Sequence, residues 1–323
     1  MTDLELNWQV PWLRGFEHHG QIVLALWRET KSLSEALNQY ASSSTLVLDS
    51  CDTTSAQLLT ALHSGVDDSQ SFGPLKGLPR FVPQANLPEG VAYESFIYNT
   101  HCVPTRENWH DFFNAMCWIR FPLTKSFLNA QQALTIQQLG HVKARGSLRD
   151  ALTLLDENAC FVWCKESMWG ALKSHDWLSA FWLQREQWGS ARVELFGHAL
   201  LEKLCNPYKA ITAHALRVGD PNGYPNEHTN DYLNVGLNVY AHASSKASSN
   251  QHPNKAPIVE KNIDQRIDQA MLATLQALPL SVKPFQALPV LGIPGWHEDN
   301  QVESFYLDEK VFRPQRVQVV KSI

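Results

Sequence analysis

Two side chains in the segment ELFGHALLEKL, His198 and Glu202, have the spacing of a helical metal-ligand pair. Residues four apart share one face of an α-helix, so an imidazole and a carboxylate one turn apart can bind a single divalent cation. Glu194 extends the same predicted face, and Gly197 would let another stretch of backbone come close. The alternative is structural: a hydrogen-bonded core histidine beside a glutamate that pairs with a lysine.

Two further histidines, His110 and His214, are candidates for the same metal. His110 and Asn114 share one stripe of the helix expected within PTRENWHDFFNAMCWIRFPLTK, and His214 lies in ITAHAL. An imidazole and a carboxamide one turn apart could bind a metal, orient a water molecule or hold a substrate carbonyl. The alternative for His110 is a buried ring that is hydrogen-bonded to an asparagine or to a backbone carbonyl.

The segment HVKARGSLRD is a candidate anion site. Lys143, Arg145 and Arg149 surround the expected start of a helix, where Ser147 and Asp150 form an S-x-x-D capping pattern. Unbonded N–H groups and the helix dipole favour an anion at such a terminus. The alternative is a solvated basic loop with an ordinary cap.

At the far end of the same helix, Asp156 and Glu157 place two carboxylates where the helix dipole disfavours negative charge. An arginine, a bound metal or simple exposure to solvent could offset this local cost.

These residues support two hypotheses. The first is a metal-dependent hydrolase acting on a small anionic substrate, with a divalent metal as its cofactor. Its candidate metal ligands are His198, Glu202, His110 and His214. Its candidate catalytic residues are Asp150, Glu157 and Arg149. Its candidate substrate-binding residues are Asn114, Arg145 and Arg149. The second hypothesis is a non-catalytic ligand- or protein-binding protein whose His/Asn/Arg/Glu cluster is a structural polar network. The residues alone leave the choice between an enzyme and a binding protein open.

Common catalytic motifs are missing from the sequence. It contains no G-x-G-x-x-G, no G-x-x-x-x-G-K-[ST], no H-E-x-x-H and no G-x-S-x-G. Dinucleotide binding, P-loop phosphoryl transfer and the usual serine-hydrolase elbow therefore lack support.

Composition narrows the class of protein. Hydrophobic residues make up 44% and charged residues 18% of the 323 residues, which is typical of a globular chain. The net charge of −5 argues against nucleic acid as the partner. The sequence does not identify the partner, and a small-molecule ligand is one candidate. The chain has no signal-like start and no long apolar window, so we expect a cytoplasmic protein that does not contact membranes. None of the six cysteines forms a C-x-x-C pair, so we expect free thiols.

The expected elements are mostly helices. Helices are predicted over Leu33–Ala41, Thr53–His63, Arg106–Phe121 with a cap at Thr105, Glu166–Trp188 and Ser190–Leu204. Pro122 should end or kink the helix before it. Short strands are predicted over Ser44–Cys51 and Ala159–Lys165. We therefore predict a mainly α fold with minor β (α+β): a compact helical core with an extended Pro-rich C-terminal tail, forming a single globular domain over residues 1–323.

Several separated blocks resemble, in order, a bacterial family called domain of unknown function 3025. The blocks are VPTRENWHDFFNAMCWIRFPLTKSFLNA, RGSLRDALTLLDEN, LFGHALLEK, KAITAHAL and LPVLGIPGW…FYLDEKVFRP. The resemblance covers a core of about residues 91–316. It implies no reaction, but it places the candidate histidines and carboxylates in family-typical blocks. The segment His242–Pro257 looks like an insertion peculiar to this chain, and its composition predicts a flexible loop.

Overall fold

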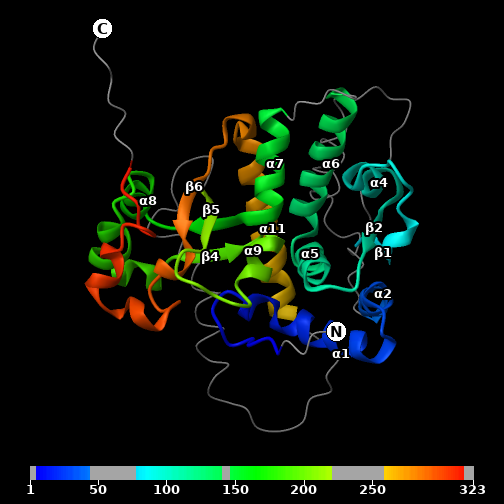
Figure 1. Cartoon of the computed structure of the whole chain (residues 1–323), viewed down its shortest axis with the longest axis horizontal. Helices are drawn as coiled ribbons and strands as arrows, with labels where there is room; N and C mark the ends of the chain where they lie inside the picture. Colours follow the sequence, from blue (N-terminus) through cyan, green and yellow to red (C-terminus); the bar gives the residue numbers. More distant parts are fainter. Residues whose placement is uncertain (1–4, 44–77, 140–145, 220–257, 316–323) are drawn as a thin grey trace. The chain divides into compact units, whose positions relative to one another are not determined.

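The computed structural model describes residues 5–43, 78–139, 146–219 and 258–315 (Figure 1). Three sequence predictions lie outside these residues: the strand over Ser44–Cys51, the helix over Thr53–His63 and the insertion over His242–Pro257. The chain is mainly α-helical with a minor β component, which confirms the predicted fold class. No described helix carries an apolar stretch long enough to cross a bilayer.

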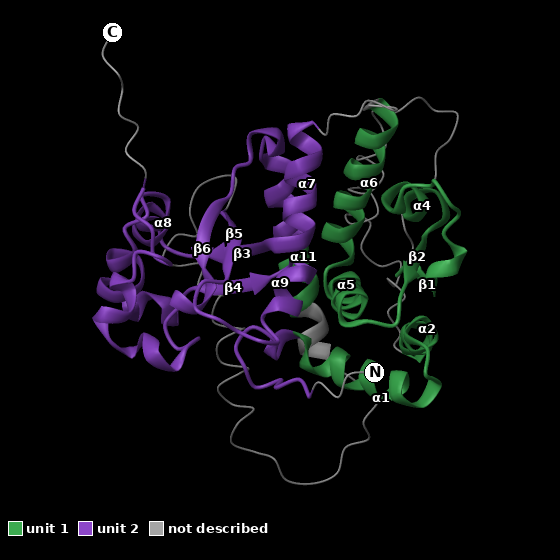
Figure 2. Ribbon diagram, viewed as in Figure 1, with its two compact units in different colours: residues 1–3, 16–143, 252–268 green, residues 4–15, 144–251, 269–323 purple. Residues whose placement is uncertain are grey.

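Two compact units divide the chain, and each is assembled from separated stretches of sequence (Figure 2). Unit 1 comprises residues 1–3, 16–143 and 252–268. Unit 2 comprises residues 4–15, 144–251 and 269–323. The last helix, α11 (Ile258–Ala277), contributes residues to both units. The sequence predicts one domain over residues 1–323, and this stays a prediction.

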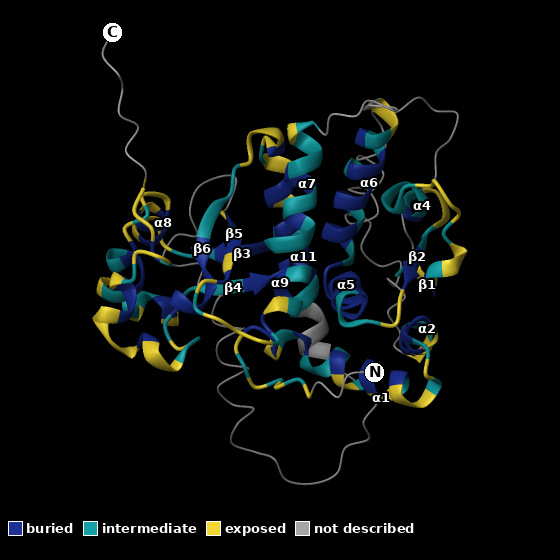
Figure 3. Ribbon diagram, in the orientation of Figure 1, coloured by how far each residue is buried: buried dark blue, intermediate teal, exposed yellow. Residues whose placement is uncertain are grey.

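Unit 1 consists of helices and a two-stranded parallel sheet. Its helices are α1 (Glu17–Thr30), α2 (Leu33–Ser43), α4 (Tyr93–Thr100), α5 (Trp109–Arg120), α6 (Pro122–Leu139) and the first part of α11. Its strands are β1 (Arg80–Pro83) and β2 (Cys102–Thr105). Helix α5 is buried over most of its length (Figure 3), and its aromatic side chains fill the core of this unit. The helix predicted over Leu33–Ala41 is confirmed.

Helix α5 begins later than the sequence predicts. Its cap is Asn108, whose side-chain oxygen accepts a hydrogen bond of 2.8 Å from the backbone N–H of Asp111. Thr105 is instead the last residue of β2, and its hydroxyl donates to the carbonyl of Val103. The predicted break at Pro122 is confirmed, because this residue opens α6, where a missing N–H costs no hydrogen bond.

Unit 2 contains a four-stranded mixed sheet in the order β4-β3-β5-β6. Its strands are β3 (Ala159–Trp163), β4 (Arg192–Leu195), β5 (Thr212–Arg217) and β6 (Gln286–Pro289). Strand β3 pairs in parallel with β5 and antiparallel with β4, and it is the buried strand that the sequence predicts. The helices of this unit are α7 (Ser147–Asn158), α8 (Glu166–Lys173), α9 (His198–Lys203) and the second part of α11.

The Pro-rich C-terminal segment contributes more local structure than an extended tail. Besides β6 it forms short 3-10 helices at Leu280–Val282, Val290–Gly292, Glu298–Gln301 and Glu303–Leu307. The fully buried Asn300 holds this segment together, because its amide nitrogen donates to the carbonyls of Leu291 and Ile293. Residues 316–323 lie outside the described part of the chain.

Two predicted helices are wrong. The helix predicted over Glu166–Trp188 is divided, because α8 ends before His175, whose φ of 55° is left-handed. A π-helix (Leu178–Leu183) and a 3-10 helix (Arg185–Gly189) follow. The helix predicted over Ser190–Leu204 is a strand followed by a short helix, β4 and α9. The β-branched Val193 pairs with Val162 of β3, so long-range pairing overrides the local helical pattern.

Candidate functional site

The candidate site of unit 2 is formed where two element junctions meet. Helix α7 ends at Asn158 and β3 begins at Ala159, with no residue between them. The connection from β4 to α9 lies against this point, because the backbone N–H groups of Phe196 and Gly197 both donate to the carbonyl of Ala159, at 3.0 and 2.9 Å. One carbonyl oxygen therefore anchors the start of α9 to the end of α7.

Gly197 is the residue that allows this approach. A Cβ at this position would lie 2.4 Å from the backbone nitrogen of Asn158 and 2.5 Å from the carbonyl oxygen of Glu157. Its φ of −65° is accessible to any residue, so the requirement for glycine is one of space and not of backbone conformation. This bears out the close backbone approach that the sequence suggests beside His198.

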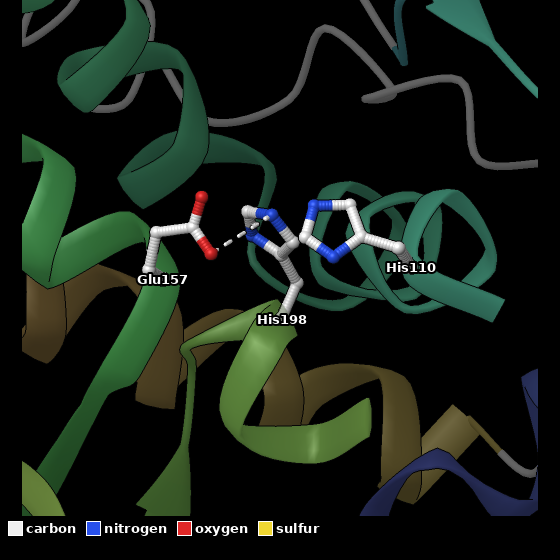
Figure 4. A group of neighbouring side chains, drawn as sticks. All are labelled: His110, Glu157 and His198. Carbon is white, nitrogen blue, oxygen red and sulfur yellow. Dashed lines mark ion pairs between the residues drawn. The ribbon is translucent and has the colours of Figure 1, made fainter. Parts of the chain in front are cut away.

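His198 is the first residue of α9, and its side chain is only 5% exposed. Its Nδ1 lies 3.7 Å from Oδ2 of Asp156, and its Nε2 lies 3.8 Å from Oε2 of Glu157. Figure 4 shows the Glu157 carboxylate turned toward the His198 ring. The last turn of α7 therefore presents one carboxylate to each nitrogen of a buried imidazole.

The distance between Nε2 of His198 and Oε2 of Glu157 has a chemical meaning. At 3.8 Å it is longer than a hydrogen bond. Two ligand atoms bound tetrahedrally to one zinc ion at its usual bond lengths lie roughly 3.4 Å apart. The pair is therefore spaced to share a cation after a small adjustment of the glutamate side chain.

The sequence predicts that Glu202 and His214 bind the same metal as His198. In the structure, Glu202 lies on α9 and His214 lies on β5. Glu202 lies one turn after His198 on α9 and is half-buried, which confirms their shared helix. His214 lies on β5 opposite Ala159 of β3, with its ring centroid 4.7 Å from that of Phe285. Burial lowers the pKa of His214, and the nearby Lys203 and Lys283 lower it further.

The helical position predicted for Glu194 is wrong. It lies on β4, so it does not share a helical face with His198. Its buried carboxylate accepts a hydrogen bond of 2.6 Å from Nε of Arg192, two residues earlier on the same strand. This ion pair gives Glu194 a structural role at the edge of the sheet.

The basic segment before α7 is described only in part. Lys143 and Arg145 lie outside the described residues. The cap of α7 is Gly146 and not Ser147, which is the first helical residue, and the cap makes no side-chain hydrogen bond. Arg149 and Asp150 lie in the first turn of α7, and both are half-buried. The anion site stays a prediction that depends on Arg149 among the described residues.

In unit 1, the polar side chains on α5 and just before it mostly form hydrogen bonds within the protein. Arg106 donates to Asp111 from its backbone N–H and from its guanidinium group. Asn114, 7% exposed, donates to the hydroxyl of Tyr93 at 3.0 Å and accepts from Nζ of the buried Lys125 at 2.8 Å. These bonds support the structural alternative for Asn114.

His110 is also carried by α5 of unit 1, and Figure 4 labels it. It is half-buried. Its predicted role as a ligand stays a prediction.

Two half-buried cysteines of unit 2 are poor nucleophiles. None of the five cysteines within the described residues forms a disulfide: Cys102, Cys117, Cys160, Cys164 and Cys205. Burial raises the pKa of Cys164 to about 11 and that of Cys205 to about 12. Since the thiolate is the reactive form, neither thiol is activated at neutral pH.

Asp156 is a residue of the site that is not among the ligands or catalytic residues predicted from the sequence. The sequence marks it only as one of two carboxylates at the end of a helix, and the structure places it beside Nδ1 of His198. A signal was present in the sequence, because Asp156 and Glu157 end a helix whose dipole repels them. A positive or polar neighbour offsets this cost, and His198 lies within 4 Å of both carboxylates.

Comparison with known proteins adds a family to these observations. The model of a family described as "Protein of unknown function (DUF3025)" matches residues 79–316 of the chain. No curated protein and no solved structure matches it.

Proposed function

Because the chain belongs to the DUF3025 family, whose description assigns no reaction, we propose its function from the residues themselves: metal-dependent hydrolysis of a small anionic substrate. The proposed centre is in unit 2, on His198 and Glu157. These two residues supply the nitrogen and carboxylate ligands that catalytic zinc sites combine.

The observation that supports the proposal is the arrangement around Nε2 of His198. This nitrogen faces a carboxylate at 3.8 Å, while the opposite ring nitrogen faces a second carboxylate at 3.7 Å. A ligating histidine typically has a carboxylate behind its other nitrogen. The side chains of His198 and Glu157 are 5% and 34% exposed, so the glutamate connects a buried ligand to solvent.

A metal needs further ligands, and the catalytic positions stay open to water or substrate. The candidates within unit 2 are Glu202 and His214. Glu202 lies one turn after His198 on the same helix, but its carboxylate is not among the possible ligand atoms that group with those of His198 and Glu157. A bound divalent metal would supply an activated water molecule at neutral pH.

The rest of the chemistry is assigned to α7. Arg149 lies seven residues before Asp156, and Asp150 lies seven residues before Glu157, so each pair shares a face of the helix. Seven residues span about 10 Å along the axis. This spacing supports a role for Arg149 in holding the anionic group of a substrate whose scissile bond lies near Glu157, and Asp150 is the proposed base. Arg145 is a second anion-binding candidate.

The test begins with metal content. Purified wild type is expected to bind one equivalent of Zn²⁺ or Mn²⁺ and to melt at a higher temperature with the metal, since a ligand that binds only the folded state stabilises it. His198→Ala and Glu157→Gln should each weaken metal binding by about 100-fold or more. Matched controls are His297→Ala and Glu303→Gln, which change the same residue types away from the site.

Hydrolysis is tested with the metal-loaded protein. p-Nitrophenyl phosphate carries an anionic group and p-nitrophenyl acetate does not, so turnover of the first alone is expected. Arg149→Gln should raise KM for the phosphate ester with a smaller effect on kcat. A wild type that binds neither metal contradicts the proposal. It would favour the alternative, in which His198 and the two carboxylates are a structural polar network of a binding protein.

A further inference from the structure

We propose that Asp156 is a positioning residue that selects the tautomer of His198. It keeps the imidazole proton on Nδ1, so that the lone pair of Nε2 faces Glu157. The tautomer is a property of the metal-free protein, and its use for metal binding rests on the proposed function. The inference concerns a residue outside the ligand set, and it gives a reason for two consecutive carboxylates in the last turn of α7.

The first argument is the symmetry of the contacts. A neutral imidazole carries one proton, so one ring nitrogen donates and the other accepts. Carboxylates lie 3.7 Å from Nδ1 and 3.8 Å from Nε2 of His198. Each carboxylate favours a proton on the nitrogen that it faces, and the distances alone leave the two tautomers nearly balanced. Something else must decide which nitrogen keeps the proton.

Burial and side-chain length decide it in favour of Asp156. The side chain of Asp156 is 21% exposed and that of Glu157 is 34% exposed, so water screens the charge of Asp156 less. Aspartate has one methylene group fewer than glutamate, so its carboxylate is held more tightly to the backbone of α7. The 3.7 Å contact of Asp156 with Nδ1 is longer than a hydrogen bond, and we expect the Asp156 carboxylate to shorten it when Nδ1 carries the proton.

The backbone and the packing around the His198 ring keep its two nitrogens from exchanging places. Gly197 donates to the carbonyl of Ala159, and a Cβ at this position would overlap backbone atoms of Glu157 and Asn158. The start of α9 is therefore fixed relative to the end of α7. With the ring only 5% exposed, a flip that exchanged its two nitrogens would have to displace packed neighbours.

The experiment reads the tautomer directly. Long-range ¹H–¹⁵N correlation spectra of metal-free, ¹⁵N-histidine-labelled protein at pH 8 distinguish a protonated from an unprotonated ring nitrogen. The His198 signals are assigned by their loss in His198→Gln. In wild type we expect Nδ1 to carry the proton and Nε2 to carry none. In Asp156→Ala the preference should fall by about tenfold or more, giving a mixture of tautomers.

Variants separate positioning from a general structural effect. Asp156→Glu restores a carboxylate and should recover the wild-type tautomer in part, whereas Asp150→Ala removes an aspartate from the first turn of α7 and should leave it unchanged. Circular dichroism checks that Asp156→Ala is folded. If the metal binds as proposed, Asp156→Ala should also weaken its affinity by roughly 10- to 100-fold.

Two results would overturn the inference. A wild-type ring protonated on Nε2, or on both nitrogens, at pH 8 contradicts it whatever the metal result. An unchanged tautomer in a folded Asp156→Ala variant also contradicts it. If the wild type binds no metal but shows the Nδ1–H tautomer, the proposed function fails and the positioning role of Asp156 stands.

Discussion

Asp268 on α11 accepts two hydrogen bonds from Thr124 at the start of α6, one of 2.9 Å from its backbone N–H and one of 2.6 Å from its hydroxyl. It also accepts a bond of 2.8 Å from the backbone N–H of Leu123. A carboxylate from one helix thus caps the first turn of another, where N–H groups lack partners within their own helix. Within unit 1, this contact pins the break between α5 and α6 to α11.

The Asp268 contact makes stability depend on pH. Burial raises the pKa of Asp268 to about 7, although its hydrogen bonds oppose the shift. The folded state therefore holds this proton more tightly than the unfolded state, and the free energy of unfolding should decrease as pH rises from about 4 to about 7. Asp268→Asn should remove this contribution, amounting to a few kcal/mol at most. The difference in melting temperature between wild type and variant, measured from pH 4 to 8, checks it.

The control for Asp268 is Asp299→Asn, which changes an exposed aspartate of unit 2. Its melting temperature should follow that of wild type across the same range. If Asp268→Asn and wild type show parallel curves, the buried carboxylate does not titrate in this window.

Gly197→Ala should destabilise the protein. The added Cβ would lie 2.4 to 2.5 Å from backbone atoms of Glu157 and Asn158, which cannot rotate away as a side chain could. Overpacking of this kind costs about 1–3 kcal/mol, and here we expect the upper end. Chemical denaturation measures the loss. A stability equal to that of wild type would mean that the end of α7 yields easily.

Gly170→Ala is the matched control. Gly170 lies inside α8 with nothing near its would-be Cβ. Alanine is the better helix former, so this variant should gain about 0.5–1 kcal/mol. The same substitution thus has opposite expected signs at two glycines of one unit.

Asn114→Ala distinguishes the two hypotheses for the stripe on α5. If Asn114 is structural, removing it takes an acceptor from the buried Lys125 and a donor from Tyr93. Loss of buried hydrogen-bond partners should then cost about 1–3 kcal/mol. A substrate-binding Asn114 would instead leave the melting temperature unchanged and raise KM. Tyr93→Phe, which removes one bond only, should show a smaller loss.

Much of the fold was accessible from the sequence where local signals are strong. The buried strand β3 and the break at Pro122 follow from β-branched residues and from the chemistry of proline. The helix predicted over Ser190–Leu204 is wrong because the periodicity of the residues VELF fits a helix and a strand equally well. Its pairing with β3 decides the outcome, and that partner lies about thirty residues earlier in the chain.

For the candidate site, too, the sequence predicts some residues but not the contacts that bring them together. His198 and Glu157 were both candidates from residue type and position, His198 as a ligand and Glu157 as a catalytic carboxylate. Their approach depends on the two hydrogen bonds that the backbone N–H groups of Phe196 and Gly197 donate to the carbonyl of Ala159, which no local pattern encodes. Asn114 was a candidate from its place on the predicted helix, but its partners Tyr93 and Lys125 come from other helices.

The direct passage from Asn158 into Ala159 also bears on how the family can diversify. Each residue inserted before this junction would turn the last residues of α7 by about 100° relative to the sheet, so Glu157 would leave the imidazole of His198. Lineages of this family should therefore vary in length elsewhere and keep this junction free of insertions and deletions. A gap there in a homologous sequence would mark a protein that has lost the pair.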